Sequence, residues 1–305
     1  RVSVADSNTP VDALVSLTAR GYPAPISAGS NPSTDANTSE KGVKIEFSGV
    51  RVVSGGHLIL RDIDLVIEPG EHVAIVGRSG AGKSTLLGVL LGWHRTAAGE
   101  ARVDGSLLTP DLLARVRSMT VWVDPEVYLW NRSFIENLRY GVPASTVADQ
   151  SAAITQAELV DVLKRLERGM ASRVGESGRR LSGGEGQRLR LGRGFVRQGT
   201  RLVLLDEPFR GLERDRRRRL LLAARRHWAQ ATLLIVTHDV EETLDMPRVL
   251  VVEDGRIVED GDPRVLVKAD SRYAALVADE RAARLEVWGR SAWRRLVVAN
   301  GRVIQ

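Results

Sequence analysis

The sequence contains no cysteine among its 305 residues, which excludes disulfide bonds and thiolate metal sites. No apolar run approaches the roughly eighteen residues that a membrane-spanning helix needs. The N-terminus lacks the charged-then-apolar pattern of a signal peptide. Lysine is scarce as well, so that arginine carries almost all of the positive charge; the lysines are Lys41, Lys44, Lys83, Lys164 and Lys268. A chain of this length can form one large domain or two smaller ones.

The densest positive charge lies at Arg214–Arg219, in a chain with a formal net charge of +6. Such a run can bind nucleic acid, and it can equally attract acidic lipid headgroups. No aromatic residue interleaves with it, however, and Leu220, Leu221 and Leu222 follow it directly. This pattern is typical of a helix with a solvated charged face. We therefore expect no nucleic acid partner.

The chain changes character along its length. Residues 1–40 are rich in Ser, Thr, Asn, Pro, Ala and Gly, which predicts a flexible linker. Because the chain starts at Arg1 rather than Met, we expect this linker to join a missing upstream region. Short alternating runs from Lys44 to Leu65 predict strands with a turn at Gly55-Gly56. Continuous apolar runs at 72–76, 202–205 and 233–236 alternate with helices, which predicts a parallel sheet covered on both faces.

Two further patterns concern helices and the C-terminus. Apolar residues with helical spacing predict a helix through Leu159, Val162, Leu163, Leu166 and Met170. Beyond about Asp262 the sequence predicts two helices. A hairpin around Asn300-Gly301 is then expected within residues 297–304.

The segment Gly77–Thr85 reads GRSGAGKST and follows the predicted strand at residues 72–76. It matches a phosphate-binding loop, in which glycines allow close backbone approach and a helix N-terminus attracts the anion. Lys83 is expected to reach the outer phosphates, and the Ser84 hydroxyl to bind Mg²⁺. The binding residues predicted in this loop are Gly77, Ser79, Gly80, Gly82, Lys83, Ser84 and Thr85. The sequence therefore predicts that the chain binds a nucleoside triphosphate.

Two other predicted strands end in polar side chains. The apolar run at residues 202–205 leads into Asp206 and Glu207, and a strand at residues 233–236 leads towards His238. Ligand groups in an open parallel sheet lie at the carboxyl ends of strands. We expect Asp206 to hold Mg²⁺, Glu207 to polarise the attacking water and His238 to contact the γ-phosphate. Taken alone, acidic residues at a strand end can be a coincidence, and a single histidine there more often has a structural role.

The segment Leu181–Glu185 opens a helix that runs through Gln187 and Arg188. Its first N–H groups and its polar side chain predict a second anion site, formed by Ser182, Gly183, Gly184 and Glu185. A single nucleotide cannot readily use two such helix starts. We therefore expect a symmetric pair of chains, in which each lends its second site to the nucleotide of the other.

These motifs, in this order, resemble the nucleotide-binding domain of ATP-binding cassette (ABC) transporters over roughly residues 41–270. The resemblance implies a P-loop NTPase (RecA-like) fold: a parallel-sheet core, an antiparallel β subdomain and an inserted helical subdomain at about 118–198. It also implies an ATPase that uses Mg²⁺ and that dimerises head to tail on ATP. The domain would cover residues 41–265, and residues 266–305 would form a helical extension with a possible hairpin.

Two segments are similar to stretches that exporters use to contact their membrane domains. These are Val174–Gly178, just before the second anion site, and Trp130–Leu138. The closest likeness is to exporters of peptides and bacteriocin-like products. By this resemblance the chain would work at the cytoplasmic face of a membrane, with a second cassette and with transmembrane domains as partners. Its substrate would be selected by those domains.

The chain departs from the family pattern at four positions. Pro125 stands where the family has a glutamine that touches Mg²⁺. That contact is either lost, supplied by water, or replaced by a neighbour such as Asp124 or Glu126. Glu213 stands in place of an aspartate, and Glu185 ends the segment Leu181–Glu185, the family's signature, where glutamine is usual. No aromatic residue lies among residues 48–60 to stack on adenine, which leaves His57 as a weak substitute.

Two other functions remain open at this stage. One is a cassette ATPase that acts on nucleic acid or ribosomes, which usually carries tandem cassettes or a long coiled coil; neither is visible here. The other is a regulatory module that scarcely hydrolyses ATP, as Pro125 and Glu213 suggest. Against it stands the presence of all four expected residues, Lys83, Asp206, Glu207 and His238.

Overall fold

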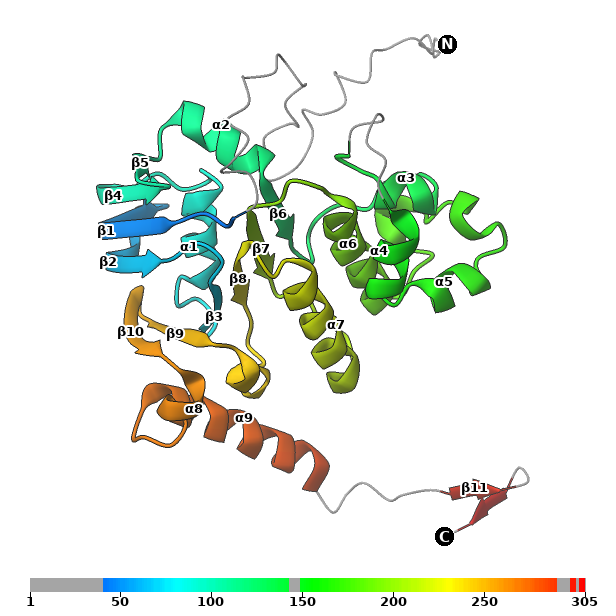
Figure 1. Ribbon diagram of the computed structural model, residues 1–305. Coiled ribbons are helices and arrows are strands. Elements are labelled where there is room, and N and C mark those ends of the chain that lie inside the picture. The colour runs from blue at the N-terminus through cyan, green and yellow to red at the C-terminus, as the bar shows by residue number, and fades with distance from the viewer. Residues whose placement is uncertain (1–40, 143–148, 290–296, 300–301, 305) are drawn as a thin grey trace, which may run out of the picture. The chain divides into compact units, whose positions relative to one another are not determined.

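The computed structural model describes residues 41–142, 149–289, 297–299 and 302–304 (Figure 1). The predicted linker at residues 1–40 lies outside these ranges. Within them the chain forms three sheets, of six, four and two strands. The six-stranded sheet carries most of the predicted site, and the other two sheets are antiparallel.

The six-stranded sheet has the order β10-β9-β3-β8-β7-β6. All neighbours in it are parallel except β10, which pairs antiparallel with β9 at the edge. The strands are β3 (His72–Val76), β6 (Thr120–Val123), β7 (Leu202–Asp206), β8 (Thr232–Val236), β9 (Arg248–Glu253) and β10 (Arg256–Gly261). As predicted, the apolar runs form adjacent parallel strands.

The central strands are buried on both faces, which explains their continuous apolar sequence. Because successive side chains point to opposite faces, each strand contributes to two separate cores. In β3, Val73 and Ile75 pack with α1 (Lys83–Leu90) and the four-stranded sheet. Ala74 and Val76 pack on the other face, with α6 (Gly183–Val196) and α7 (Arg214–His227).

The four-stranded antiparallel sheet has the order β2-β1-β4-β5. Its strands are β1 (Ile45–Ser54), β2 (His57–Ile67), β4 (Ala98–Val103) and β5 (Ser106–Leu107). The predicted turn at Gly55-Gly56 joins β1 to β2, and both glycines have positive φ. The helix α2 (Pro110–Ser118) then leads to β6. Nearby, the rings of Trp93 and Trp122 pack edge to face, with centroids 4.5 Å apart.

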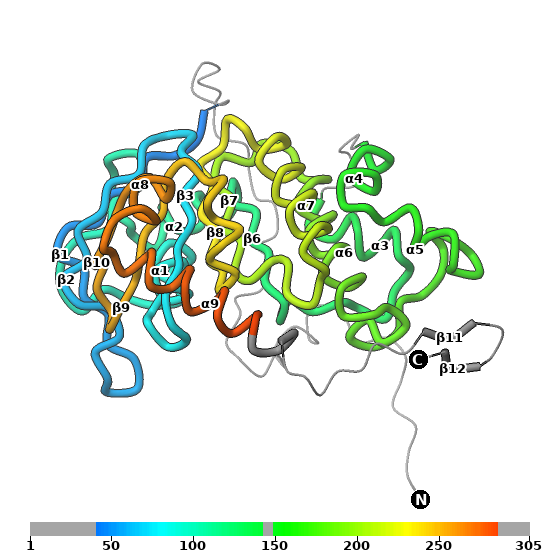
Figure 2. The backbone as a smooth tube through the Cα atoms, turned by 90° about the horizontal axis from the view of Figure 1, so that it is seen from below, coloured from blue at the N-terminus to red at the C-terminus, as the bar shows by residue number. Residues whose placement is uncertain are grey.

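A group of helices lies beside β6 in both views (Figures 1 and 2). It comprises α3 (Phe134–Leu138), α4 (Gln150–Gln156), α5 (Val160–Arg165), η2 (Gly169–Ala171), η3 (Glu176–Gly178) and α6. Of the predicted helical subdomain at about 118–198, residues Thr120–Val123 are instead the edge strand of the six-stranded sheet. The remaining described segments up to Val196 are mainly helical.

The prediction of one helix through Leu159 and Met170 is wrong. Helix α5 ends at Arg165, and Leu166 is extended, with φ −78° and ψ 127°. A short 3₁₀ turn, η2, then contains Gly169 with φ 48°. An ordinary right-handed helix cannot contain a residue with this left-handed φ, so the apolar spacing continues across a break.

The C-terminal part contains η4 (Val240–Asp245), α8 (Pro263–Leu266) and α9 (Arg272–Gly289). Tyr273 of α9 is fully buried, and its hydroxyl lies 2.9 Å from the Thr243 hydroxyl of η4. The strands β11 (Val297–Ala299) and β12 (Arg302–Ile304) pair antiparallel. Across the described ranges, no helix has the length and apolar character of a membrane span.

Candidate functional site

The loop between β3 and α1 has a backbone that only glycine accommodates at two positions. Gly77 has φ 145°, and a Cβ atom there would lie 2.1 Å from the carbonyl oxygen of Val252. Gly82 caps α1 with φ 102° and has no side-chain capping bond. The first N–H groups of α1 are therefore not bound by a capping side chain, which is the arrangement of a helix N-terminus that binds an anion. Ser79, Gly80 and Ser84 are exposed around it, and Thr85 is half-buried.

Lys83 lies inside this loop with only 8% of its surface exposed. Its ammonium group donates hydrogen bonds to the carbonyl oxygens of Gly77, at 2.8 Å, and of Arg78, at 2.9 Å. Burial lowers the pKa of Lys83, while the nearby carboxylates of Glu207 and Asp206 act in the opposite direction. The structure thus brings the predicted lysine together with both predicted acidic residues.

Asp206 ends β7 and is almost fully buried. Burial raises the pKa of Asp206, and the Ser84 hydroxyl, which donates a hydrogen bond to the carboxylate, opposes that rise. These two oxygen donors suit Mg²⁺, which prefers hard oxygen ligands. Among the described residues no group of three or more His, Cys, Asp or Glu side chains could hold a metal alone. This donor set fits Mg²⁺ that is held largely by nucleotide phosphates, with one or two protein carboxylates.

Glu207 follows Asp206 and has φ 46°, an uncommon conformation for a residue other than glycine. Its Oε2 lies 2.6 Å from Nδ1 of His238, which comes two residues after β8. The hydrogen bond from His238 to Glu207 raises the pKa of His238. The backbone of Glu207 is fixed by its N–H, which donates to the Val236 carbonyl oxygen of β8 at 3.0 Å. Two strand ends therefore hold a carboxylate and an imidazole in contact.

Asp124 follows β6 and precedes Pro125, the residue predicted at the glutamine position. Burial raises the pKa of Asp124 to about 6, and the charge of Asp206 adds to this rise. Pro125 lines a cavity rather than offering any polar side chain. A third strand end of the same sheet thus brings a carboxylate towards Asp206.

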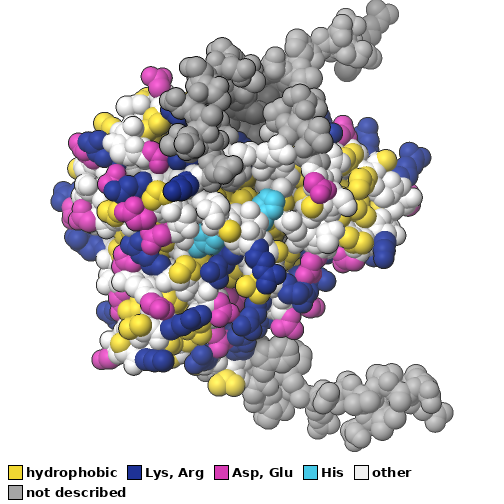
Figure 3. Space-filling model, in the orientation of Figure 1, with side chains coloured by type: hydrophobic (Ala, Val, Ile, Leu, Met, Phe, Trp, Pro, Cys, Tyr) yellow, Lys and Arg dark blue, Asp and Glu magenta, His cyan; other side chains and the backbone are white. Residues whose placement is uncertain are grey.

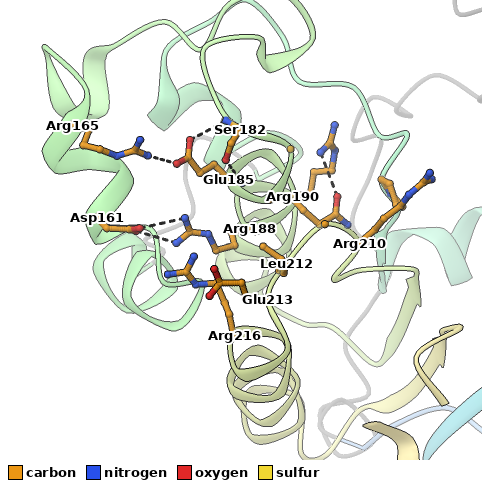
Figure 4. A pocket seen from close by; sticks show the side chains of 15 residues that line it. Asp161, Arg165, Ser182, Glu185, Arg188, Arg190, Arg210, Leu212, Glu213 and Arg216 are labelled. Atoms are coloured by element: carbon orange, nitrogen blue, oxygen red, sulfur yellow. Dashed lines mark hydrogen bonds and ion pairs between the residues drawn. The ribbon is translucent and has the colours of Figure 1, made fainter. Parts of the chain in front are cut away.

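The second predicted anion site lies at the start of α6. Ser182 and Glu185 form a reciprocal capping box: the Glu185 N–H donates to the Ser182 hydroxyl at 3.3 Å, and the Ser182 N–H donates to Glu185 at 3.0 Å. Arg165 of α5 also donates to the Glu185 carboxylate (Figure 4). Ser182 and Gly183 are exposed to solvent.

This helix start lines a cavity of about 670 Å³ (Figure 4). Its other lining residues come from α5, from further along α6, from the loop before α7, from Arg216 of α7 and from Pro125; those on α6 include Arg188 and Arg190. None of residues 77–85, all of which are described, lines it. The starts of α1 and α6 therefore do not share this cavity, and their use as two anion sites stays a prediction.

Three further residues, Arg190, Glu213 and His57, lie outside the group around Lys83 and Asp206. Arg190 was not predicted, yet its guanidinium lies in the cavity wall and donates to the carbonyl oxygen of Val127 at 2.6 Å. The sequence could have indicated Arg190 only through the three closely spaced arginines, at 188, 190 and 193, of the helix that begins at Ser182. Glu213 caps α7 without a side-chain bond. His57 is exposed beside the β1–β2 turn.

The arginine run of α7 is neutralised by intramolecular ion pairs. Its acidic partners lie in η4, in the residue before it, and at Glu158: Arg214–Glu241, Arg216–Glu158, Arg217–Asp239, Arg217–Glu242, Arg218–Asp245 and Arg219–Glu158. Lys and Arg side chains accordingly alternate with Asp and Glu on the face in Figure 3. This pairing supports the interpretation of the run as a helix face. The absence of a nucleic acid partner stays a prediction.

A glycine-rich loop with a buried lysine, and acidic strand ends beside it on a parallel sheet, define a P-loop nucleoside triphosphatase. Residues 60–210 match the family model described as ABC transporter. The chain belongs to the ABC transporter family, and it contains the ATP-binding and ATP-hydrolysing domain of that family with the predicted P-loop fold.

The relatives agree with this assignment. The chain is 35% identical over 235 residues to an ATP-dependent lipid A-core flippase of Alkalilimnicola ehrlichii, covering 76% of this chain and 40% of the relative. It is 35% identical over 232 residues to the mycobactin import ATP-binding/permease protein IrtB of Mycolicibacterium smegmatis, covering 75% of this chain and 40% of the relative. The structure of a bacterial Atm1-family ABC exporter with ATP bound matches with a TM-score of 0.73 and 29% identity. The match covers 78% of this chain and 42% of the exporter chain.

The chain thus spans about 40% of the length of these relatives. Their names refer to lipid A-core and to mycobactin rather than to peptides. The peptide cargo that the sequence resemblance implied therefore stays a prediction.

Proposed function

We propose that this domain binds Mg-ATP at the start of α1 and hydrolyses it to power a membrane exporter. The observation that supports this most strongly is the convergence of Lys83, Asp206, Glu207 and His238 on one edge of the sheet. Lys83 would bind the outer phosphates, and Ser84 with Asp206 would hold Mg²⁺. The metal would supply charge stabilisation for the transferring phosphoryl group.

Glu207 would act as the general base for the attacking water. Its contact with His238 orients the carboxylate, because the imidazole nitrogen holds one of its two oxygens. His238 is itself largely exposed at the sheet edge, so that it can contact the γ-phosphate of a bound nucleotide. Such positioning and charge stabilisation account for most of the catalysis of phosphoryl transfer.

A second cassette would complete each site. The exposed start of α6, with Ser182, Gly183 and Gly184, has no nucleotide loop of its own chain in its cavity. We propose that it binds the γ-phosphate held by a partner cassette, in a head-to-tail dimer that carries two ATP molecules. Reciprocal use of two different patches follows from two-fold symmetry.

The membrane partner would dock on the two exporter-like segments, at the cytoplasmic face of the membrane. These segments lie side by side, because the Val174 N–H donates to the Arg132 carbonyl oxygen at 3.1 Å. The hydroxyl of Tyr128, two residues before the second segment, also donates to Glu176 of the first at 2.9 Å. Tyr128, Tyr140 and Met170 are exposed large apolar residues of this region. Transmembrane domains of an exporter fit this surface.

Replacement of Glu207 by glutamine tests the proposal. We expect Glu207→Gln to keep ATP binding while turnover falls by about 100-fold or more, the scale of a lost general base. Because hydrolysis would release the dimer, size-exclusion chromatography with ATP should show a persistent dimer of the variant. The control is Glu100→Gln, an exposed carboxylate of β4. A Glu207→Gln protein that stays monomeric, or that hydrolyses ATP normally, contradicts the proposal.

A further inference from the structure

The ends of β6 and β7 place two aspartates next to each other. These strands are parallel, and Val123 pairs with Leu205. Asp124 and Asp206 follow these residues by one position, on strands whose backbones are about 4.8 Å apart. Residues in register on neighbouring strands face the same side of a sheet. On that side, Asp206 accepts the hydrogen bond from Ser84.

The chain turns immediately after Asp124. The Glu126 N–H donates to Oδ1 of Asp124 at 2.5 Å, which forms a turn closed by the aspartate side chain across Pro125. The proline ring fixes one backbone angle of this turn. Oδ2 of Asp124 accepts no hydrogen bond from the described residues. One oxygen of the carboxylate therefore fixes the turn, and the other is available to a ligand.

Arg190 of α6 fixes the same turn from the other side. Its Nε donates to the carbonyl oxygen of Val127 at 2.6 Å, and its positive charge attracts Asp124. Gly186 leaves the space that this guanidinium needs, since a Cβ atom there would lie 3.3 Å from Nη1 of Arg190. The turn of residues 124–127 is thus held between the sheet and the helix that opens at Ser182.

We propose that Asp124 is a second carboxylate ligand for the Mg²⁺ of bound Mg-ATP, in place of the side chain that Pro125 lacks, and that Arg190 positions it. This inference rests on the proposed function. Magnesium in nucleotide sites is held by one or two carboxylates together with phosphate oxygens, so that Asp206 and Asp124 make a sufficient protein contribution.

The test measures how nucleotide binding depends on Mg²⁺, with a fluorescent ATP analogue and rising free Mg²⁺. Asp124→Asn keeps the size of the side chain and an oxygen for the Glu126 N–H, but it removes the charge. We expect it to raise the half-saturating Mg²⁺ concentration by about 10–100-fold, the scale of a lost metal-supporting group. Binding in EDTA should stay as in the wild type.

Glu126→Gln is the matched comparison, because Glu126 is the other carboxylate that the sequence offered for this contact, and its exposed charge lies two residues away. It should change the Mg²⁺ requirement by less than about threefold, as expected for an exposed charge. Adding Pro125→Gln to Asp124→Asn should recover part of the loss. Equal Mg²⁺ requirements for Asp124→Asn and wild type, or equal effects of Asp124→Asn and Glu126→Gln, would overturn the inference. If Asp124→Asn does not fold by circular dichroism, Asp124→Ser provides the same comparison.

Arg190 is tested by a double-mutant cycle. If it acts through Asp124, Arg190→Ala should raise the Mg²⁺ requirement of the wild type and add nothing in the Asp124→Asn background. Additive effects would mean that Arg190 has only a structural role. The proposed function is tested separately, because a wild-type protein that fails to bind ATP at all contradicts the ATP site itself. Normal ATP binding with an unchanged Asp124→Asn contradicts only the second ligand.

Discussion

The two helix starts that the sequence marks as phosphate sites differ in how they are capped. Helix α1 begins at Gly82, which has no side chain to bond its first N–H groups, and Lys83 is folded into the loop beside it. Helix α6 begins at Ser182, whose hydroxyl and whose partner Glu185 satisfy two N–H groups of that helix. The first site is open, and the second is partly closed by its own side chains.

This difference indicates how much each helix start contributes to nucleotide affinity. A phosphate at α1 gains free N–H groups and a nearby ammonium without displacing a protein group. A phosphate at α6 finds only the first two N–H groups free, and it meets the carboxylate of Glu185, which Arg165 balances. The Ser182 hydroxyl accepts a bond from Glu185, so its own proton is still available for donation. Most of the affinity should therefore come from α1, and α6 should respond to a nucleotide already bound.

The largest effect should come from Lys83→Ala. Loss of a phosphate-facing charge costs about 3 kcal/mol, which corresponds to a loss of about 100-fold in affinity. Titration of a fluorescent ATP analogue measures it directly. Lys268→Ala, which removes an exposed lysine between α8 and α9, is the control and should bind normally. Equal affinities for Lys83→Ala and wild type would show that α1 is not the primary site.

A smaller effect is expected from Ser182→Ala. A hydrogen bond to a charged group contributes about 1.5 kcal/mol, so each of the two ATP sites of the proposed dimer should hold its partner cassette about 10-fold more weakly. ATP binding to the monomer should not change. Sedimentation at several protein concentrations with ATP measures the dimer.

The helix α3 provides a control for this change. Ser133 and Glu136 form the same capping box as Ser182 and Glu185. Either serine replaced by alanine should cost about 1 kcal/mol of stability through the lost cap. Only Ser182→Ala should affect the dimer. If both variants weaken dimerisation equally, the second site acts through helix stability alone.

The smallest expected effect is a loss of folding stability in acid through the histidines near β3 and α1. Burial lowers the pKa of His72, at the start of β3, and of His94, which packs against α1. Both are neutral in the folded state, so the unfolded chain takes up protons first as the pH falls below about 6.5. Stability that is present above this pH is therefore lost on acidification towards the lowered pKa values.

Part of this loss should also reach α6, because burial lowers the pKa of His227 of α7, whose ring centroid lies 4.9 Å from that of Phe195 of α6. Thermal melts at pH 7.5 and pH 5.5 should show a smaller loss for His72→Gln than for wild type. Hydrogen exchange, corrected for its intrinsic pH dependence, should locate in β3 the part of the loss that His72→Gln removes. Equal losses in wild type and His72→Gln would contradict this account.

The sequence was most informative where local rules and burial agree. The strands β3, β7 and β8 followed from apolar runs, because both faces of these strands are covered. The break after Arg165 did not, because Leu166 and Met170 keep helical spacing while Gly169 leaves the helix. The Ser182–Glu185 pair fits both a capping box and an anion site, and only the geometry shows the cap in place.

Contacts between distant segments could not be predicted in the same way. Glu158 pairs with two arginines of α7 that lie about sixty residues away in sequence. Arg190 reaches Val127 across a similar separation. No local pattern marks such partners, because they depend on how the helices pack beside the sheet. The sequence therefore predicted which polar side chains gather at the edge of the sheet better than the residues that hold them.

The edge-to-face pair of Trp93 and Trp122 has an optical consequence. Trp93 follows α1, and Trp122 lies in β6, two residues before Asp124. Two indole rings at this spacing couple their near-ultraviolet transitions, and that coupling changes with their separation and tilt. The circular dichroism spectrum should therefore record any displacement of β6 relative to α1. Near-ultraviolet circular dichroism of the unlabelled protein can therefore report whether a ligand at α1 moves β6, the strand that leads to Asp124 and Pro125.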